Sequence, residues 1–585
     1  MINFDDDWEK VTGRRFETKE ETKAAKKPPD KDTQEKKFQD KKPQESREAL
    51  PAVPEKTAEK TAAVAPVKND SIIDRVRLFY SFIGTFIFYM AANAFECFNF
   101  IPRYDALNYI DHFADSWEVR LGRFLQPLYG SIRGNFQLPW VVGMLSIIYI
   151  ALAVYLLTDM LKIKNKWYIM LVGGILSANI TVTSLNASYT FLVDAYMFSL
   201  LMSVLGVYLI NKRARLVNML LGSLCFFIAL GMYQAFASVI LVTVSLIMIR
   251  DLLTEKINLR MFLHWVCHGV SLLLGVIWYY FFYQEEIYRL GVEAAGGYNG
   301  LGNLSGNLGS GVSAIPALVG KNYLAILRFF FINDDEVTLE CAICNYVLVL
   351  ILIICFIRLS SKRKTGALNV VLAAVLGLIL LPLAMMLISI GMGNIFIMYR
   401  VSYALFFLYI LMFALSSWES ESPEEDSGKR VRFSRCLQLV SIVCSLIILC
   451  SNIRVSNEVY VLQKIMYDRT LSYVTRIADD VTAVDGYDRQ NMRVVIVGDI
   501  NSKTMFNFEL IRNHYGIFGE DNTALSYEQT ITSYLSVLRN NMTIEEEPDV
   551  INQYKAMPEV QEMPAYPKDG YCRLIGDRVV VKLPE

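Results

Sequence analysis

The chain has 585 residues, of which 54% are hydrophobic and 20% are charged, and its formal net charge is -1. This composition is typical of an integral membrane protein, so we expect the lipid bilayer to surround much of it. A net charge close to zero gives no bulk electrostatic attraction for nucleic acid, and we predict no nucleic-acid partner.

The N-terminal segment, residues 1–70, alternates Lys with Glu and Asp among Pro, Ala, Thr and Gln, as in KKPPDKDTQEKK. Such a segment buries too little apolar surface to offset the entropy cost of ordering it. We predict a disordered tail here. We predict no signal peptide, because the first apolar run begins only near Leu78.

Apolar runs then recur along the chain, and a membrane span needs roughly 20 such residues. They cover residues 78–100, 138–160, 167–186, 191–211, 216–231, 233–249, 262–284, 339–357, 367–390, 400–417 and 434–452. We therefore predict a polytopic α-helical membrane domain over residues 71–452, with about eleven spans. The fifth and sixth runs are short, which leaves a re-entrant hairpin at Tyr233-Gln234 as an alternative to two full spans.

Short basic loops alternate between the predicted spans, and such loops stay in the cytoplasm. They lie at residues 162–166, 212–215, 250–260, 358–364 and 429–435. A cytoplasmic N-terminus places all five of these loops on the cytoplasmic side of the membrane. We therefore predict a cell-membrane protein whose C-terminal segment, 453–585, is extracytoplasmic.

Clusters of β-branched residues at 493–497 and 577–582 predict strands in this C-terminal segment, and residues 456–483 and 526–540 are predicted helices. A small α/β or α+β domain is expected.

The loop after the first span, residues 101–137, is predicted outside and concentrates both signs of charge. Its acidic residues are Asp105, Asp111, Asp115 and Glu118, and its basic residues are Arg103, Arg120, Arg123 and Arg133. Charges inside hydrocarbon are costly and usually mark a site. Glu96, Asp194 and Arg400 fall near the outer ends of three predicted spans, which suggests one polar cavity that opens outwards beside this loop.

Carboxylates and arginines together suit the transfer of a group from a phosphate to a hydroxyl. A carboxylate accepts the proton of the attacking hydroxyl, and arginine holds the phosphate through its planar fork. Nucleotide sugars are absent outside the membrane, so an activated sugar must arrive there on a lipid phosphate. We predict no metal site and no cofactor, because arginine can neutralise a single donor phosphate. The acidic loop leaves recruitment of a divalent ion open.

Short motifs support this interpretation. They are Trp117-x-x-Arg120-x-Gly122-Arg123 after the first span, Tyr233-Gln234 between two spans, and Tyr399-Arg400 at the start of a late span. With the acidic loop and the soluble C-terminal segment, they resemble the GtrII family of membrane glycosyltransferases over roughly residues 75–480. The resemblance implies a GT-C-type fold and a polyprenyl-phosphate sugar donor. It also implies adjacent acidic residues at the loop start, where this chain has Tyr104-Asp105 and then Asp111.

We therefore predict a hexosyltransferase that moves a sugar from a polyprenyl-phosphate carrier to a hydroxyl of a cell-surface polysaccharide. Asp105 is the first candidate for the catalytic base and Asp111 the second. Arg123 and Arg400 are candidates for binding the donor phosphate. The other predicted substrate-binding residues are Glu96, Trp117, Arg120, Asp194, Tyr233 and Gln234. If residues 104–119 form one helix, Asp111, Asp115 and Glu118 share a face, and we expect Asp115 and Glu118 to be solvated.

Two alternative functions use the same charged cavity. A transporter or flippase of lipid-linked saccharides would need no chemistry and would show inverted repeats and broken helices. A polysaccharide polymerase would use lipid-diphosphate oligosaccharides. The sugar, the acceptor, the stereochemical outcome and the oligomeric state stay open at this point.

Overall fold

The structure is a computed structural model that describes residues 74–102, 106–107, 116–134, 138–295, 315–332, 337–363, 366–391, 397–421, 428–498, 535 and 542–584. The predicted tail 1–70, the predicted bases Asp105 and Asp111, and the predicted helix 526–540 apart from residue 535 lie outside these residues.

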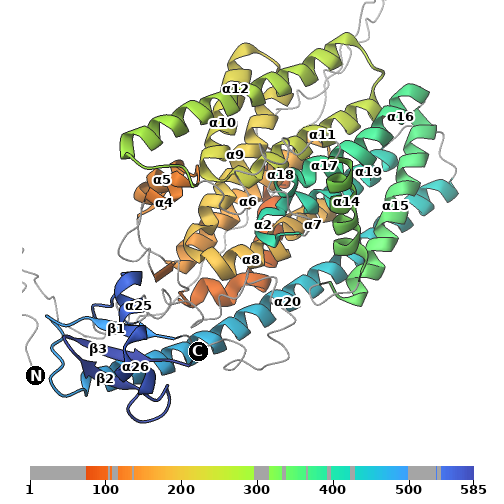
Figure 1. Cartoon of the computed structure of the whole chain (residues 1–585). Coiled ribbons are helices and arrows are strands. Elements are labelled where there is room, and N and C mark those ends of the chain that lie inside the picture. The colour runs from red at the N-terminus through yellow and green to blue at the C-terminus, as the bar shows by residue number, and fades with distance from the viewer. Residues whose placement is uncertain are drawn as a thin grey trace, which may run out of the picture. The chain divides into compact units, whose positions relative to one another are not determined.

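Most of the described chain forms helices that pack side by side (Figure 1). Nine helical stretches in the described part are long and apolar enough to cross a membrane: Arg75–Phe98, Pro139–Met160, Lys166–Lys212, Gln234–Thr254, Leu259–Leu290, Leu339–Arg363, Ala367–Met385, Tyr403–Ser420 and Val431–Thr482. A multi-pass membrane protein is thereby confirmed. The count of eleven stays a prediction, because Lys166–Lys212 contains two of the predicted spans and Leu216–Met232 is a shorter helix.

The first half of the membrane domain contains α2 (Arg75–Phe98), α4 (Ser116–Arg120), α5 (Leu125–Arg133), α6 (Pro139–Met160), α7 (Lys166–Ser177), α8 (Ile180–Tyr189), η1 (Thr190–Leu192), α9 (Val193–Lys212), α10 (Leu216–Met232), η2 (Gln234–Phe236), α11 (Ala237–Thr254) and α12 (Leu259–Leu290). The second half contains α14 (Ile315–Phe331), α15 (Leu339–Arg363), α16 (Ala367–Val375), η5 (Leu376–Leu380), α17 (Leu381–Met385), α18 (Leu387–Gly391), η6 (Tyr399–Val401), η7 (Tyr403–Phe406), α19 (Phe407–Ser420) and α20 (Gly428–Thr482).

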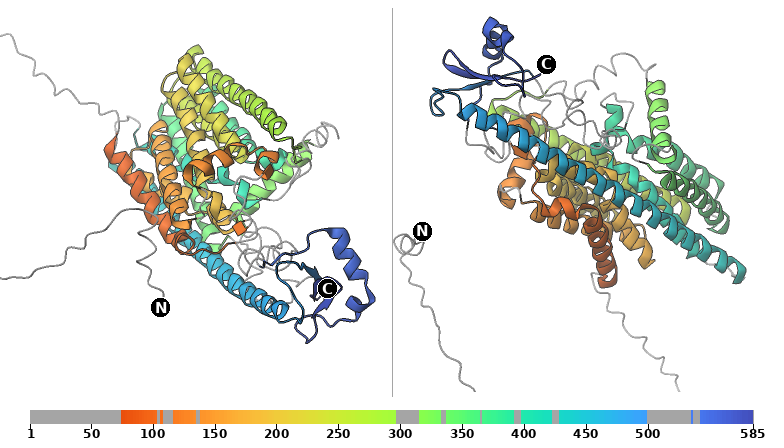
Figure 2. Two further views of the ribbon diagram at one scale, coloured as in Figure 1. Left: turned by 90° about the vertical axis from the view of Figure 1, so that its left-hand side faces the viewer. Right: turned by 90° about the horizontal axis from the view of Figure 1, so that it is seen from below.

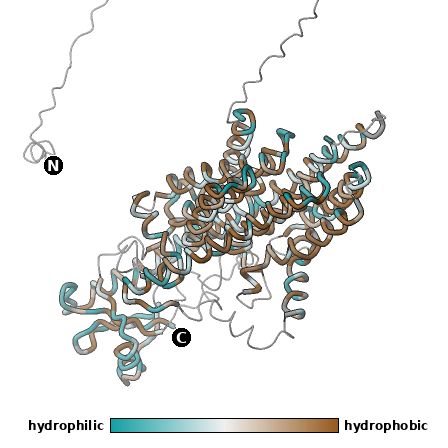
Figure 3. Tube along the Cα trace, turned by 90° about the horizontal axis from the view of Figure 1, so that it is seen from above, coloured by the Kyte–Doolittle hydropathy of each residue, from teal (hydrophilic) through white to brown (hydrophobic). Residues whose placement is uncertain are grey.

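Apolar side chains cover much of the outside of this domain. Figure 3 shows hydrophobic residues along the helices and hydrophilic residues gathered in the C-terminal part of the chain. On α12, large apolar residues are exposed along most of the helix: Leu263, Val270, Leu273, Ile277 and Phe281. An apolar surface of this length fits contact with lipid chains.

The stretch from α7 to α9 is interrupted twice. At Asn179 the backbone is extended, and the side-chain Oδ1 accepts a 3.1 Å hydrogen bond from the amide of Val182, which caps α8. The second interruption follows Tyr189, where η1 leads into α9. These breaks place residues 189–196 beside the ends of α2 and α6 and not in a continuous span. We call this end of the bundle, where α2 ends and α6 begins, the site end.

The C-terminal part forms a small α+β unit at the end of α20 (Figure 2). Its sheet has the order β1-β3-β2, with β1 (Val494–Val497) parallel to β3 (Arg578–Lys582), and β2 (Cys572–Ile575) antiparallel to β3. The helices α25 (Pro548–Ala556) and α26 (Pro558–Glu562) complete it. Strands β1 and β3 confirm the two predicted strands, whereas β2 was not predicted because its four residues show no apolar alternation.

Candidate active site

The motif Trp117-x-x-Arg120-x-Gly122-Arg123 forms a tight turn between α4 and α5. The amide of Gly122 donates to the carbonyl of Val119 over 2.8 Å, and the amide of Arg123 donates to the carbonyl of Glu118 over 2.8 Å. Gly122 has a φ of +80°, a conformation that glycine adopts without steric cost. The turn therefore aims the Arg123 side chain back along α4.

Gln234 contacts this turn through hydrogen bonds of its side-chain amide. Its Nε2 donates to the carbonyl of Leu121 over 2.8 Å and to the hydroxyl of Tyr279 over 3.0 Å. A Cβ atom at Gly122 would lie 2.6 Å from Gln234 Nε2 and would also collide with the Tyr279 hydroxyl. Close approach and positive φ thus both require glycine, and Gln234 is placed to position the turn.

The guanidinium of Arg123 lies over an aromatic ring. Its Cζ is 5.0 Å from the centroid of Tyr233, and its Nη1 is 3.6 Å from Glu118 Oε2. Its Nε has no hydrogen-bond partner among the residues that the structure describes. Such a cation retains donor capacity for an anionic ligand.

Glu118 is only 5% exposed, so the expectation of a solvated surface residue is wrong. That expectation assumed one helix over residues 104–119. The helix α4 covers only Ser116–Arg120, and the turn that follows folds the Glu118 side chain beneath Arg123.

Arg400 reaches the same group of aromatic rings from η6. Its Nη1 donates to the Tyr189 hydroxyl over 2.7 Å, and its Cζ is 5.4 Å from the Tyr189 ring centroid. The Tyr233 hydroxyl donates to the Arg400 carbonyl over 3.2 Å. The Tyr233 ring packs on Tyr196 at 4.4 Å between centroids, and Tyr196 meets Tyr189 edge-on at 6.4 Å. We name Arg123, Arg400, Tyr189, Tyr196 and Tyr233 the Arg–Tyr cluster.

Asp194 pairs with an arginine outside this cluster. Its Oδ1 accepts a 2.6 Å bond from Arg133 Nη1, and its Oδ2 accepts a 2.9 Å bond from the Tyr129 hydroxyl. Burial and the carboxylate of Asp194 raise the pKa of the Tyr129 phenol well above its usual range, which keeps it a donor. Arg133 Nη1 also donates to the Phe191 carbonyl over 2.9 Å. This buried pair ties α5 to the start of α9.

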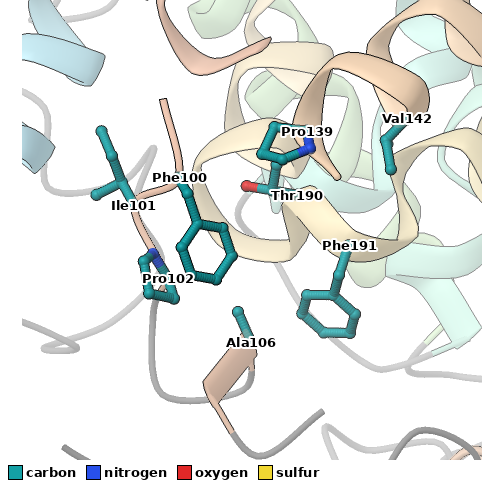
Figure 4. A pocket seen from close by; sticks show the side chains of 8 residues that line it. All are labelled: Phe100, Ile101, Pro102, Ala106, Pro139, Val142, Thr190 and Phe191. Carbon is teal, nitrogen blue, oxygen red and sulfur yellow. The ribbon is translucent and has the colours of Figure 1, made fainter. Parts of the chain in front are cut away.

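Glu96 lies at the end of α2 and is 1% exposed. Its Oε1 accepts a 3.0 Å hydrogen bond from Thr190 Oγ1. Thr190 also lines a small, mostly apolar recess. Its residues come from the segment that follows α2, the start of α6 and η1: Phe100, Ile101, Pro102, Ala106, Pro139, Val142, Thr190 and Phe191 (Figure 4). The predicted base Asp105 immediately precedes Ala106 in the sequence.

Trp117 and Arg120 form the rim of the turn. Arg120 Cζ lies 5.5 Å from the Trp117 ring centroid, and Arg120 Nε donates to the Glu293 carbonyl over 3.1 Å. The Tyr283 hydroxyl donates to the Arg120 carbonyl over 3.1 Å. Trp117 remains 37% exposed, so its ring is partly accessible from outside the turn.

The predicted site residues therefore fall into neighbouring groups joined by residues 189–196. Tyr189 and Tyr196 belong to the Arg–Tyr cluster. Thr190 donates a hydrogen bond to Glu96, and Asp194 accepts one from Arg133. We predicted only Asp194 in this segment. The pattern of aromatic and polar residues in Tyr-Thr-Phe-Leu-Val-Asp-Ala-Tyr, following the helix-capping Asn179, was the available signal.

The family model for glucosyl transferase GtrII matches residues 94–417, a range that contains all three groups. The chain belongs to this family. No curated protein and no solved structure gives a match.

Membership of the GtrII family makes the chain a membrane-embedded glycosyltransferase. The predicted GT-C type stays a prediction. Among the described residues, no group of three or more His, Cys, Asp or Glu side chains lies together as a metal site.

Proposed function

We propose that this protein transfers a glucosyl residue from a polyprenyl-phosphate carrier to a hydroxyl of a cell-surface polysaccharide. The site end of the bundle faces the outside of the cell in this proposal, in line with the alternating basic loops. The observation that carries it is the Arg–Tyr cluster, in which two arginines from distant parts of the chain border three tyrosines.

Arg123 and Arg400 bind the donor phosphate in this mechanism. Each guanidinium lies over a tyrosine ring, which supports the cation, and the planar guanidinium group is suited to paired hydrogen bonds with phosphate oxygens. As the bond between the sugar C1 and the phosphate oxygen breaks, negative charge grows on the leaving phosphate. Fixed arginines stabilise that charge without the reorganisation that water would require.

The acceptor hydroxyl attacks C1 and loses its proton to a carboxylate. Asp105 and Asp111 are the candidates, as the sequence predicts, and both lie outside the described residues. The products are the glycosylated acceptor and the polyprenyl phosphate, while the proton resides on the carboxylate. The exposed ring of Trp117, beside Arg120, offers a stacking surface for a sugar.

A flippase of lipid-linked saccharides is the second candidate, since α7, α8 and α9 form an interrupted helical stretch lined by buried polar residues. It predicts movement of the lipid-linked sugar between leaflets without transfer. Measuring both activities on the same reconstituted protein separates the two functions.

The test of the proposed roles uses four single variants of the full chain in vesicles that contain polyprenyl-phosphate glucose and the acceptor glycan. Arg123→Lys and Arg400→Lys should each raise the donor KM, because a lysine cannot form the planar two-point contact. Asp105→Asn and Asp111→Asn should lower kcat, and at least one should abolish transfer. Arg289→Lys, at an exposed ion pair with Glu286, is the matched control. Unchanged kinetics in all four variants would overturn the assignment.

A further inference from the structure

Leu107 connects the loop after α2 to the C-terminal domain. Leu107 is 0% exposed and belongs to the hydrophobic cluster formed by the end of α20 and one face of the C-terminal sheet. Its neighbour Ala106 belongs to the hydrophobic core of the membrane domain. Two consecutive residues of this loop are thus buried in two different cores.

The helix α20 makes the other connection between these cores. Residues up to Met466 pack in the membrane-domain core, and residues from Val474 onward pack with the sheet. Val474 follows Met466 by eight positions, which is about 12 Å along the helix axis at 1.5 Å rise per residue. Between Met466 and Val474, Thr470 is also fully buried. The helix is therefore held on both sides of the junction.

The sheet presents alternate faces to its two layers of helices. Val494, Ile496, Val579 and Val581 face α20 and the Leu107 cluster. Val495 and Val580 belong to a separate cluster with Tyr554 of α25 and Val560 of α26. Adjacent, fully buried valines at 579 and 580 thus point to opposite sides of one strand, and only Val579 shares a cluster with Leu107.

We propose that the C-terminal domain is a positioning part of the transferase, and that it fixes the loop between α2 and α4 through Leu107. This inference rests on the proposed function. The family match ends at residue 417, so the match itself assigns no role to the domain. Leu107 lies two residues after Asp105 and four before Asp111 in the sequence.

Anchoring at Leu107 matters because catalysis depends on the placement of the base. Displacement of a catalytic group by about 1 Å can reduce the rate on the order of a hundredfold. The proposed donor phosphate site, Arg123 in the turn between α4 and α5 and Arg400 in η6, does not include Leu107. Loss of the anchor should therefore reduce kcat and leave the donor KM nearly unchanged.

The experiment compares Leu107→Ala with Leu107→Met in the full chain, reconstituted with polyprenyl-phosphate glucose and acceptor glycan. We expect Leu107→Ala to lower kcat at least tenfold with less than a twofold change in donor KM. Leu107→Met, which nearly preserves volume, should stay within threefold of the parent chain. Val579→Ala should lower kcat more than Val580→Ala, which removes the same atoms from the opposite face.

Hydrogen exchange provides a readout that does not need activity. Leu107→Ala should speed amide exchange in Val474–Val481 and in β1, whereas Leu107→Met should not. If the parent chain transfers glucose and Leu107→Ala keeps kcat within twofold, the positioning role is overturned while the proposed function stands. If amide exchange in the α20 segment is also unchanged, Leu107 does not pack against the end of α20. If the parent chain transfers no sugar, the proposed function fails, and the positioning role fails with it.

Discussion

The hydroxyl of Tyr233 donates a 3.2 Å hydrogen bond to the backbone carbonyl of Arg400, across 167 residues of sequence. The ring of the same tyrosine lies under the guanidinium of Arg123. Tyr233 follows directly after α10, where the helix ends and η2 begins. One residue at a helix break therefore contacts both arginines that we assign to the donor phosphate.

Tyr233→Phe should lower kcat/KM about fivefold, because it removes one hydrogen bond of about 1 kcal/mol while keeping the ring under Arg123. Tyr323→Phe is the matched control, since the Tyr323 hydroxyl donates to backbone carbonyls of Leu378 and Ile379 away from the cluster. Steady-state transfer kinetics of both variants test the assignment. Equal effects of the two substitutions would show that the Tyr233 hydroxyl has no special role.

Gly122→Ala should reduce transfer at least a hundredfold, since the new methyl group would meet Gln234 and Tyr279 and displace Arg123. Gly291→Ala is the control, because it introduces backbone strain without a steric contact. Gly291 has a φ of +63° at the end of α12 and nothing within 4 Å of its Cβ position. That control should cost about 1 kcal/mol in stability and retain transfer. Full activity in Gly122→Ala would refute the positioning of Arg123 by this turn.

Replacing one partner of the Arg133–Asp194 pair should destabilise the membrane domain by about 3–5 kcal/mol, because the other charge stays buried. The side chains are 4% and 0% exposed. We expect Asp194→Asn to lower the midpoint of thermal unfolding in detergent, and Arg133→Met combined with Asp194→Leu to recover much of the loss. A normal midpoint for Asp194→Asn, together with a raised donor KM, would instead support the predicted substrate-binding role of Asp194.

The C-terminal domain should lose stability in acid through Glu545. Burial alone raises the pKa of this carboxyl group, but the Glu547 amide and the guanidinium groups of Arg578 and Arg493 outweigh burial and lower the pKa below its ordinary value. A lowered pKa stabilises the fold above the unfolded-state pKa of about 4.3, and this contribution disappears as the pH falls through the folded-state pKa.

Hydrogen exchange of β1 and β3, corrected for the intrinsic rate at each pH, measures this effect. Protection in the parent chain should fall between pH of about 5 and about 3. Glu545→Gln should weaken protection already at neutral pH and flatten the pH dependence. Glu562→Gln, at an exposed carboxylate, should follow the parent chain. An unchanged profile in Glu545→Gln would exclude Glu545 as the acid-sensitive group.

Much of the membrane domain was predictable because a span of apolar residues is a strong and local signal. The motifs around Arg123, Tyr233 and Arg400 also indicated where the arginines would meet, and the structure brings all three together. The break after Tyr189 falls between the predicted spans 167–186 and 191–211. The break at Asn179 was not predicted, because a hydropathy average changes little at a single capping residue inside an apolar run.

Contacts between residues that are distant in the sequence were harder to predict than the membrane spans. Arg133 and Asp194 lie 61 residues apart, and no local pattern links them. In the sequence, Leu107 is a single apolar residue in a loop rich in charged residues. Its burial depends on a C-terminal domain that is more than 360 residues away in the sequence. Glu118 was misplaced because its face was inferred from a helix longer than α4. In each case the outcome depends on tertiary packing.

The most direct measurement is transfer of radiolabelled glucose by the purified full chain in vesicles, from polyprenyl-phosphate glucose to surface polysaccharide. We predict that label appears in the polysaccharide with the parent chain and is lost with Arg123→Ala, while Arg289→Ala transfers normally. Absence of transfer from the lipid-linked donor, or full transfer by a folded Arg123→Ala chain, would contradict the proposed reaction at the Arg–Tyr cluster.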